Sequence, residues 1–187
     1  MTSAVATRGY TVDRFLALPD SDRYELIDGC KRERDMSADA VWVSSQFSAR
    51  LIVFNDTARL GLVFGDGLPL EIFPLRPKYM PRPDGAYISY ERLGQRTPPD
   101  DAITVAPELV IEVISTHEKA NEIEGKVREY LRAGVNLVWV AYPDYASIHV
   151  FRADGSAAVL TPPAELSGED ILPGFSIPVA RLFPPAS

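Results

Sequence analysis

The sequence predicts an α/β domain in which a mixed β-sheet carries helices on its faces. The run Leu109–Ile114 is short, apolar and β-branched apart from one acid, as expected of a strand buried on both faces. Residues Lys119–Ala133 then repeat apolar side chains at helical spacing, and Leu137–Val140 is a second apolar run. A strand, a helix and a strand at this spacing predict a right-handed parallel crossover.

The composition agrees with one domain. At 187 residues with 46% hydrophobic content, the chain can bury one sizeable core. We expect residues 1–9 to be a flexible N-terminus and residues 10–187 to form a single domain. No apolar run approaches the length of a membrane span and the start lacks a secretion signal, so a cytoplasmic protein without membrane contact is expected.

One cysteine, Cys30, excludes an internal disulfide framework and a cysteine-cluster zinc site. It is a weak nucleophile candidate, because neither His117 nor His149 stands in a pattern that would pair with it as a base. We expect His117 to be an exposed residue at a helix start, although it lies near the site proposed below. His149 falls within an alternating strand and is expected to be structural.

The first half of the chain alternates between strand and helix patterns. Asp28 and Gly29 form a strong two-residue hairpin signal, and Phe47, Leu51 and Phe54 recur at helical spacing. The predicted elements are a helix Thr11–Leu18, a hairpin of strands Tyr24–Ile27 and Lys31–Met36, a helix Val43–Leu60, a second hairpin of Leu62–Phe64 and Leu70–Phe73, and a strand Gly85–Ile88, followed by a polar loop Glu91–Ala106.

The C-terminal part is predicted to close the sheet. Strands Ser147–Phe151 and Ala157–Leu160 flank an Asp-Gly turn and form a further hairpin. In the proline-rich tail, Ile171–Phe175 should pack onto the body and Val179–Phe183 should form a last helical turn.

Glu112 interrupts the apolar run of the central strand and needs a reason to be there. Removing an ionised carboxylate from water costs roughly several kcal/mol, so we expect it to be paired, raised in pKa or bound to a metal. Lys126 lies on the following helix, at the border of its apolar stripe, and Asp84 opens another apolar segment after Arg82 and Pro83. Two acids and a lysine suggest a metal-dependent phosphodiester site.

Each of these residues also has a structural interpretation. Glu112 can form a buried ion pair or mark a strand end. Lys126 has Glu122 four residues before it, an arrangement typical of a surface salt bridge on a helix. Asp84 follows a proline and can simply cap a turn.

The overall charge argues against nucleic-acid binding. The 19 basic and 26 acidic residues give −7, whereas autonomous nucleic-acid binders usually carry a basic excess. Clustering softens this objection, since Lys31–Arg34 follows the first hairpin turn and Arg76, Lys78 and Arg82 precede the first candidate acid. Such a rim could hold phosphate, and its structural alternative is a solvated hairpin edge whose charges prevent aggregation.

Five short motifs stand in an order and spacing that are together fairly specific. They are Tyr24–Gly29, Arg82-Pro83-Asp84, Glu112–Ser115, Lys126-x-x-x-Tyr130-x-x-x-Gly134-Val135 and Trp139-Val140. In this respect the chain resembles the bacterial restriction endonuclease family of the domain-of-unknown-function type, part of the PD-(D/E)XK nuclease superfamily. Leu166–Phe175 is similar to that family's closing segment, and the resemblance spans roughly residues 10–183. It implies a restriction-endonuclease-like α/β core, a mixed sheet flanked by helices.

The resemblance further implies a site and an activity. Asp84 and Glu112 would bind Mg²⁺ or Mn²⁺, and Lys126 would replace the lysine that the superfamily places two residues after the second acid, where this chain has Ile114. Glu25 would be an auxiliary acid at the edge of the site, or else a plain hairpin residue. The implied enzyme is an endonuclease that hydrolyses DNA to 5′-phosphate and 3′-hydroxyl ends, with DNA as its substrate and a homodimer as its assembly.

This set of residues suits the chemistry. A divalent cation on two hard oxygen ligands neutralises a phosphate oxygen and lowers the pKa of a bound water. A lysine beside it can orient that water and stabilise the charge that develops in the transition state. No covalent intermediate is required.

The chain departs from the family pattern at several positions. Many members carry a glutamate at Cys30, a histidine near Val43 and Ser44, a proline at Thr116 and an aspartate at Glu122. These departures and the acidic charge leave open a second function, a nuclease-fold domain that binds nucleic acid or a protein partner without cleavage. A carboxylate-based glycosidase is a distant third, because nothing places two acids across a sugar-sized groove.

Overall fold

The computed structural model describes residues 9–34, 36–115 and 120–185. At its centre is a six-stranded sheet in the order β3-β4-β5-β6-β7-β8. Strands β5 and β6 run parallel, and the other neighbours in this sheet run antiparallel. The strands are β3 (Gly61–Phe64), β4 (Gly85–Ser89), β5 (Leu109–Val113), β6 (Leu137–Tyr142), β7 (Ser147–Arg152) and β8 (Ala157–Leu160). The predicted mixed sheet is therefore confirmed.

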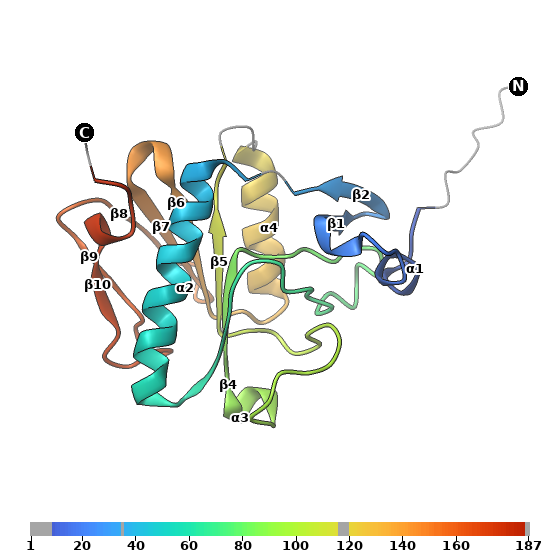
Figure 1. Cartoon of the computed structure of the whole chain (residues 1–187), viewed down its shortest axis with the longest axis horizontal. Coiled ribbons are helices and arrows are strands. Elements are labelled where there is room, and N and C mark those ends of the chain that lie inside the picture. Colours follow the sequence, from blue (N-terminus) through green and yellow to red (C-terminus); the bar gives the residue numbers. More distant parts are fainter. Residues whose placement is uncertain (1–8, 35, 116–119, 186–187) are drawn as a thin grey trace, which may run out of the picture.

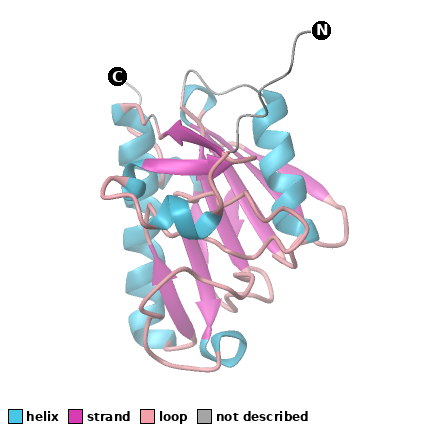
Figure 2. Cartoon of the chain, turned by 90° about the vertical axis from the view of Figure 1, so that its right-hand side faces the viewer, coloured by secondary structure: helices cyan, strands magenta, loops and turns pink. Residues whose placement is uncertain are grey.

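Two helices cover the sheet, α2 (Ala38–Ala58) on one face and α4 (Ala120–Arg132) on the other (Figures 1 and 2). Side chains that alternate along β5 enter two separate cores. Ile111 packs in the core that α2 and the C-terminal segment share, whereas Val110 packs in the core beneath α4. All five residues of β5 are buried, as the continuous apolar run predicts.

The predicted parallel crossover is present. The chain passes from β5 through α4 to β6, where Ile111 lies beside Trp139. Gly134, with a φ of 101°, follows the end of α4 in the left-handed conformation that glycine adopts without strain. Residues 1–8 of the predicted flexible N-terminus, together with Thr116, His117 and Lys119, lie outside the described residues.

The first predicted hairpin is also confirmed. Strands β1 (Tyr24–Ile27) and β2 (Cys30–Glu33) are antiparallel, and Asp28 and Gly29 both have the positive φ that a two-residue hairpin turn requires. This hairpin lies beside the main sheet, with Leu26 bridged to Met80. The short elements before it are α1 (Val12–Leu16), which Thr11 caps, and the 3₁₀ turn η1 (Ser21–Arg23).

The second predicted hairpin is wrong. β3 pairs with β4 instead, with Leu62 opposite Ile88. Leu70 makes an isolated parallel bridge with Ile103, and no strand follows it there. A distant partner replaces the local one because β4 is almost wholly buried, so that pairing with it buries more apolar surface than a local hairpin would.

The remaining differences concern element boundaries. Helix α2 begins at Ala38, earlier than predicted, because the Ser37 hydroxyl accepts a hydrogen bond from the Ala40 amide at 3.2 Å and caps it. The predicted polar loop opens with a short helix, α3 (Tyr90–Leu93). Elements too short to leave a pattern are η2 (Pro143–Tyr145), β9 (Glu165–Ser167) paired with β10 (Ser176–Pro178), and η3 (Val179–Arg181).

The C-terminal segment packs as predicted. Leu172 and Phe175 are buried in the core shared with α2, and the ring of Phe175 stacks on Trp139 at 5.9 Å between centroids. None of the described helices is long and apolar enough to cross a membrane.

Candidate active site

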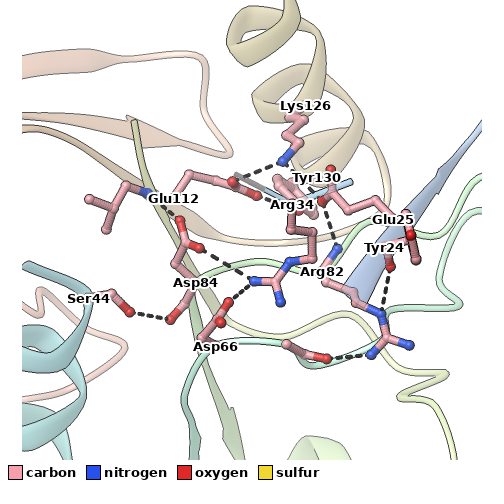
Figure 3. Close-up of polar contacts among 12 residues, drawn as sticks. Tyr24, Glu25, Arg34, Ser44, Asp66, Arg82, Asp84, Glu112, Lys126 and Tyr130 are labelled. Atoms are coloured by element: carbon pink, nitrogen blue, oxygen red, sulfur yellow. Dashed lines mark hydrogen bonds and ion pairs between the residues drawn. The ribbon is translucent and has the colours of Figure 1, made fainter. Parts of the chain in front are cut away.

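Strands β4 and β5 bring two acids together (Figure 3). Their antiparallel register sets Gly85 beside Ile111, so Asp84, one residue before β4, lies opposite Glu112. Residues directly opposite in such a pair point to the same side of the sheet. Both acids are buried, with exposed fractions of 8% and 3%. The predicted pair therefore lies side by side at the end of β5, on the face that α4 covers.

Asp84 is held by two hydrogen bonds, one to its side chain and one to its backbone. Its Oδ2 accepts a hydrogen bond from the amide of Val113 at 2.6 Å, and its carbonyl oxygen accepts one from the hydroxyl of Ser44 at 3.2 Å. Burial and the charge of Glu112 raise the pKa of the Asp84 carboxyl to about 7, against the opposing effects of the Val113 amide and two nearby cations. Two adjacent buried carboxylates repel each other, and either a proton on Asp84 or a bound cation would relieve that repulsion.

Lys126 extends from α4 towards the two strands. Its Nζ lies 3.1 Å from Glu25 Oε1 and 3.2 Å from Glu112 Oε2. The alternative surface pair with Glu122 is not formed, because Glu122 pairs with Arg32 at 2.8 Å. The lysine therefore lies between two buried acids rather than in solvent.

Glu25 is a buried member of this group and not an exposed hairpin residue. Its Oε1 accepts a hydrogen bond from the amide of Arg82 at 2.9 Å, in addition to its contact with Lys126. The bridge between Leu26 and Met80 holds β1 against the segment that leads to Asp84. All four predicted site residues thus lie in one cluster, and their catalytic roles stay a prediction.

Tyr130 was not predicted as a site residue, because its spacing placed it in the apolar stripe of α4. Its hydroxyl donates a 2.6 Å hydrogen bond to Glu112 Oε1. Burial and the nearby charge of Glu112 raise the pKa of this phenol well above its ordinary value, which keeps it a donor. Residues four apart share one face of a helix, so the spacing Lys126-x-x-x-Tyr130 was the signal that could have found it.

Arg34 and Arg82 were expected in the basic rim, but their contacts, and the part played by Asp66, were not predicted because the partners are distant in sequence. Arg34, just after β2, forms an ion pair with Asp66 and places Nη2 3.7 Å from Asp84 Oδ1. Arg82, which is 7% exposed, donates to the carbonyl oxygens of Tyr24 at 3.1 Å and Gly67 at 2.5 Å. No local pattern indicates contacts of this kind.

These side chains line a pocket of about 300 Å³. Its charged lining among the described residues comprises Arg32, Arg34, Arg76, Arg82 and Lys126, with Glu25, Glu33, Asp84, Glu112 and Glu122. Formal charges on this lining cancel, in contrast to the −7 of the whole chain. The basic rim expected from the sequence is present in part, since Lys31 and Lys78 do not belong to this lining.

The two acids fit a divalent cation. Carboxylate oxygens are hard donors that Mg²⁺ and Mn²⁺ accept. Within the described part of the chain, no three His, Cys, Asp or Glu side chains converge into a metal-binding group. Mg²⁺ commonly uses one or two carboxylates and keeps several waters, so a two-acid site suits it.

Two other residues considered from the sequence lie away from this cluster. His149 is on β7, its ring 4.5 Å from that of Tyr142, and burial lowers its pKa. Its predicted structural role agrees with this packing. Cys30 is exposed at the start of β2 and does not line the pocket.

The fold is a mixed sheet between helices, and the site has two acids on adjacent strands with a lysine beside them. Together these features are consistent with the PD-(D/E)XK class of nucleases. A family model matches residues 12–180, and the chain belongs to that family, Uma2, described as "Putative restriction endonuclease". The resemblance deduced from the sequence motifs is thereby confirmed.

A solved structure supports the fold. The structure of "a putative nuclease belonging to DUF820" from Anabaena variabilis is similar, with a TM-score of 0.77 over 92% of this chain and 97% of that one. The two chains are 19% identical, so the likeness concerns the fold alone. A search of the curated proteins finds no match.

Proposed function

We propose that this protein is a divalent-cation-dependent endonuclease that hydrolyses the phosphodiester bonds of DNA. The observation that carries the proposal is the pair of buried acids, Asp84 and Glu112, on adjacent strands, with Lys126 Nζ 3.2 Å from the second acid in the same pocket. Membership of a family of restriction endonucleases supports a nucleic-acid substrate.

In this proposal each residue has a distinct task. Asp84 and Glu112 would hold Mg²⁺ or Mn²⁺, which neutralises a phosphate oxygen and lowers the pKa of a bound water. The Val113 amide and the Tyr130 hydroxyl orient the two carboxylates through their 2.6 Å hydrogen bonds. Lys126, held between Glu112 and the auxiliary acid of β1, would orient the attacking water and stabilise charge on the phosphate. The products would be 5′-phosphate and 3′-hydroxyl ends.

The local charge supports an anionic substrate in spite of the acidic chain. The formal charges of the described residues that line the pocket sum to zero, so a divalent cation bound to the two acids would give the pocket a net positive charge. A field of this kind, confined to a pocket, attracts a phosphodiester even when the net charge of the protein is negative.

The test is nicking of supercoiled plasmid in Mg²⁺ and in Mn²⁺. Wild type should nick in either cation and not in EDTA, whereas Glu112→Gln at matched concentration should not nick. Glu124→Gln is the control, because this acid lies on α4, is exposed and, among the described residues, pairs with Arg128 alone. Equal nicking by wild type and Glu112→Gln would place the chemistry elsewhere.

One observation favours a second function, a nuclease-fold domain that binds nucleic acid or a protein without cutting it. Arg34 lies beside Asp84, and Lys126 lies between Glu25 and Glu112, so each acid has a cationic neighbour supplied by the protein itself. Absence of nicking by wild type, together with calorimetric proof that Mg²⁺ or Mn²⁺ binds, would favour this function.

We also propose a homodimer, since restriction-type enzymes often pair to cut two strands. The outer side of α2 supports this assembly, because Val41, Trp42, Ile52 and Val53 are all exposed there. Such a stripe is typical of a helix that packs on a partner. Light scattering should give a dimer mass for wild type and a monomer mass for Trp42→Glu, and a monomeric wild type would contradict the proposal.

A further inference from the structure

We propose that Arg34 and Arg82 form a phosphate-binding subsite beside the two acids, and that it takes a backbone phosphate next to the one that is cut. This inference rests on the proposed function and specifies how the substrate backbone is held. Its basis is the convergence of two largely buried guanidinium groups, from distant segments, on one side of the pocket.

The two arginines meet at the Asp66-Gly67 turn. Arg82 Nη1 donates to the carbonyl of Gly67 at 2.5 Å, and Arg34 Nη1 lies 3.6 Å from the position that a Cβ on Gly67 would occupy. The left-handed φ of Gly67, 94°, turns the chain at this point. Both arginines therefore line the same pocket, with the Arg34 guanidinium beside Asp84 and the Arg82 guanidinium further from it, on the side of Tyr24 (Figure 3).

The two arginines differ in their partners. Arg34 uses Asp66 and Asp84 as partners. Within the described part of the chain, Arg82 has no carboxylate at ion-pair distance and its guanidinium donates only to backbone carbonyls, through Nε and Nη1. Arg82 is 7% exposed and Arg34 lies at the same turn, so two cations repel each other where water screens their charges weakly.

An anion at this position would relieve that repulsion. The planar guanidinium fork matches the oxygens of a phosphate, and Arg82 retains Nη2 as a donor beyond its two carbonyl contacts. Arg82 stands two residues before Asp84, and both residues line the pocket. A phosphate bound by Arg82 would therefore share the pocket with the phosphate at the two acids, as a neighbouring phosphate of the same strand does.

The experiment is the binding of a short fluorescein-labelled DNA duplex, followed by anisotropy in EDTA and in Ca²⁺ over a range of salt concentrations. Arg34→Gln should weaken binding about tenfold or more, since a charge-assisted contact is lost. The slope of log K against log salt should become shallower by about 0.9 for the one lost phosphate contact. Arg82→Lys, which keeps the charge but loses the fork, should weaken binding less.

Arg92→Gln is the matched control. Arg92, on α3, also donates to two backbone carbonyls, those of Ala106 and Gly134, and does not line the pocket. Its affinity and salt slope should equal those of wild type. Thermal melts of all variants check that each one folds.

The outcomes separate this subsite from the nuclease activity itself. Unchanged affinity and slope in both Arg34→Gln and Arg82→Lys overturn the subsite, and nicking by wild type would still support the proposed function. An equal loss in Arg92→Gln also overturns it, because the effect would then reflect overall charge. Weaker binding in Arg34→Gln and Arg82→Lys but not in Arg92→Gln supports the subsite, even if wild type does not cut DNA. If wild type does not bind DNA at all, both the subsite and the proposed function are overturned.

Discussion

At Asp84 the surroundings change the chemistry of one carboxyl group. Its pKa moves from an ordinary value of 3.8 to about 7, mainly because of burial and then because of the charge of Glu112. Between about pH 4 and pH 7 the Asp84 carboxyl is therefore ionised in the unfolded chain but still protonated in the folded protein. The ionisation of Asp84 thus costs stability as the pH rises through this range.

We expect Asp84→Asn to remove this pH dependence. In EDTA, the free energy of unfolding of wild type should fall from pH 5 to pH 8 relative to that of Asp84→Asn, by about 2.7 kcal/mol at 1.36 kcal/mol per pKa unit over the two units from pH 5 to pH 7. Urea unfolding of both proteins at each pH measures the difference. Parallel pH profiles would contradict a raised pKa at this residue.

Tyr130 gives a second prediction at the scale of one residue. Tyr130→Phe removes the 2.6 Å hydrogen bond to a buried carboxylate, so the free energy of unfolding should fall by about 1–3 kcal/mol. Tyr87→Phe is the control, because Tyr87 is equally buried on the other side of the sheet and its hydroxyl has no hydrogen bond within the described residues. Equal losses in the two variants would mean that the bond to Glu112 contributes little.

At the scale of elements, α4 does most to form the cluster. It presents Lys126 and Tyr130, one turn apart, to the end of β5, while Ile123 and Val127 anchor it in the core. The β1–β2 hairpin contributes only Glu25 and, just beyond it, Arg34. A stable helix against a buried strand is therefore what keeps the lysine close to its acid.

Two glycines in this region should respond in opposite ways to the same substitution. Gly125 lies inside α4 with open space at its Cβ position, so Gly125→Ala should stabilise the protein by about 0.5–1 kcal/mol. Gly134 has a φ of 101°, so Gly134→Ala should destabilise it by about 1 kcal/mol or more. Thermal unfolding of both variants measures the pair, and the same sign for both would contradict the described backbone.

At the scale of the whole molecule, the candidate site joins three parts of the fold. The acids come from the sheet, the lysine from α4 and the auxiliary acid from the hairpin. Unfolding would separate all of them, so a cation that needs both Asp84 and Glu112 should bind the folded state alone. Cation binding and global stability are then linked.

We therefore expect Mg²⁺ to raise the melting temperature. At a concentration of one hundred times its Kd the gain should be about 2.7 kcal/mol, and each kcal/mol corresponds to roughly 2–4 °C for a chain of this size. Calorimetric scans with Mg²⁺ and with EDTA measure the shift in melting temperature for wild type and for two variants. Glu112→Gln should show no shift, and Glu124→Gln should show the same shift as wild type. A shift that survives in Glu112→Gln would place the cation elsewhere.

Much of the fold follows from local patterns. The apolar run of β5, the helical stripe of α4 and the Asp28-Gly29 turn each predict their elements, because neighbours in sequence impose the period or the turn. The strand-helix-strand order then predicts the parallel crossover, which sets Lys126 near Glu112. Asp84, Glu112 and Lys126 could be named from the residues themselves, whereas Glu25 was named through the family resemblance.

The sequence by itself thus determined the sheet, the helices and the acids with their lysine. Only the tertiary structure decided that β3 pairs with β4, that Arg34 lies between Asp66 and Asp84, and that Arg82 is buried without a carboxylate partner in the described residues. The physical reason is that these contacts join segments far apart in the chain. Which of them form depends on the total apolar burial and charge balance of the folded molecule, and no local period carries that information.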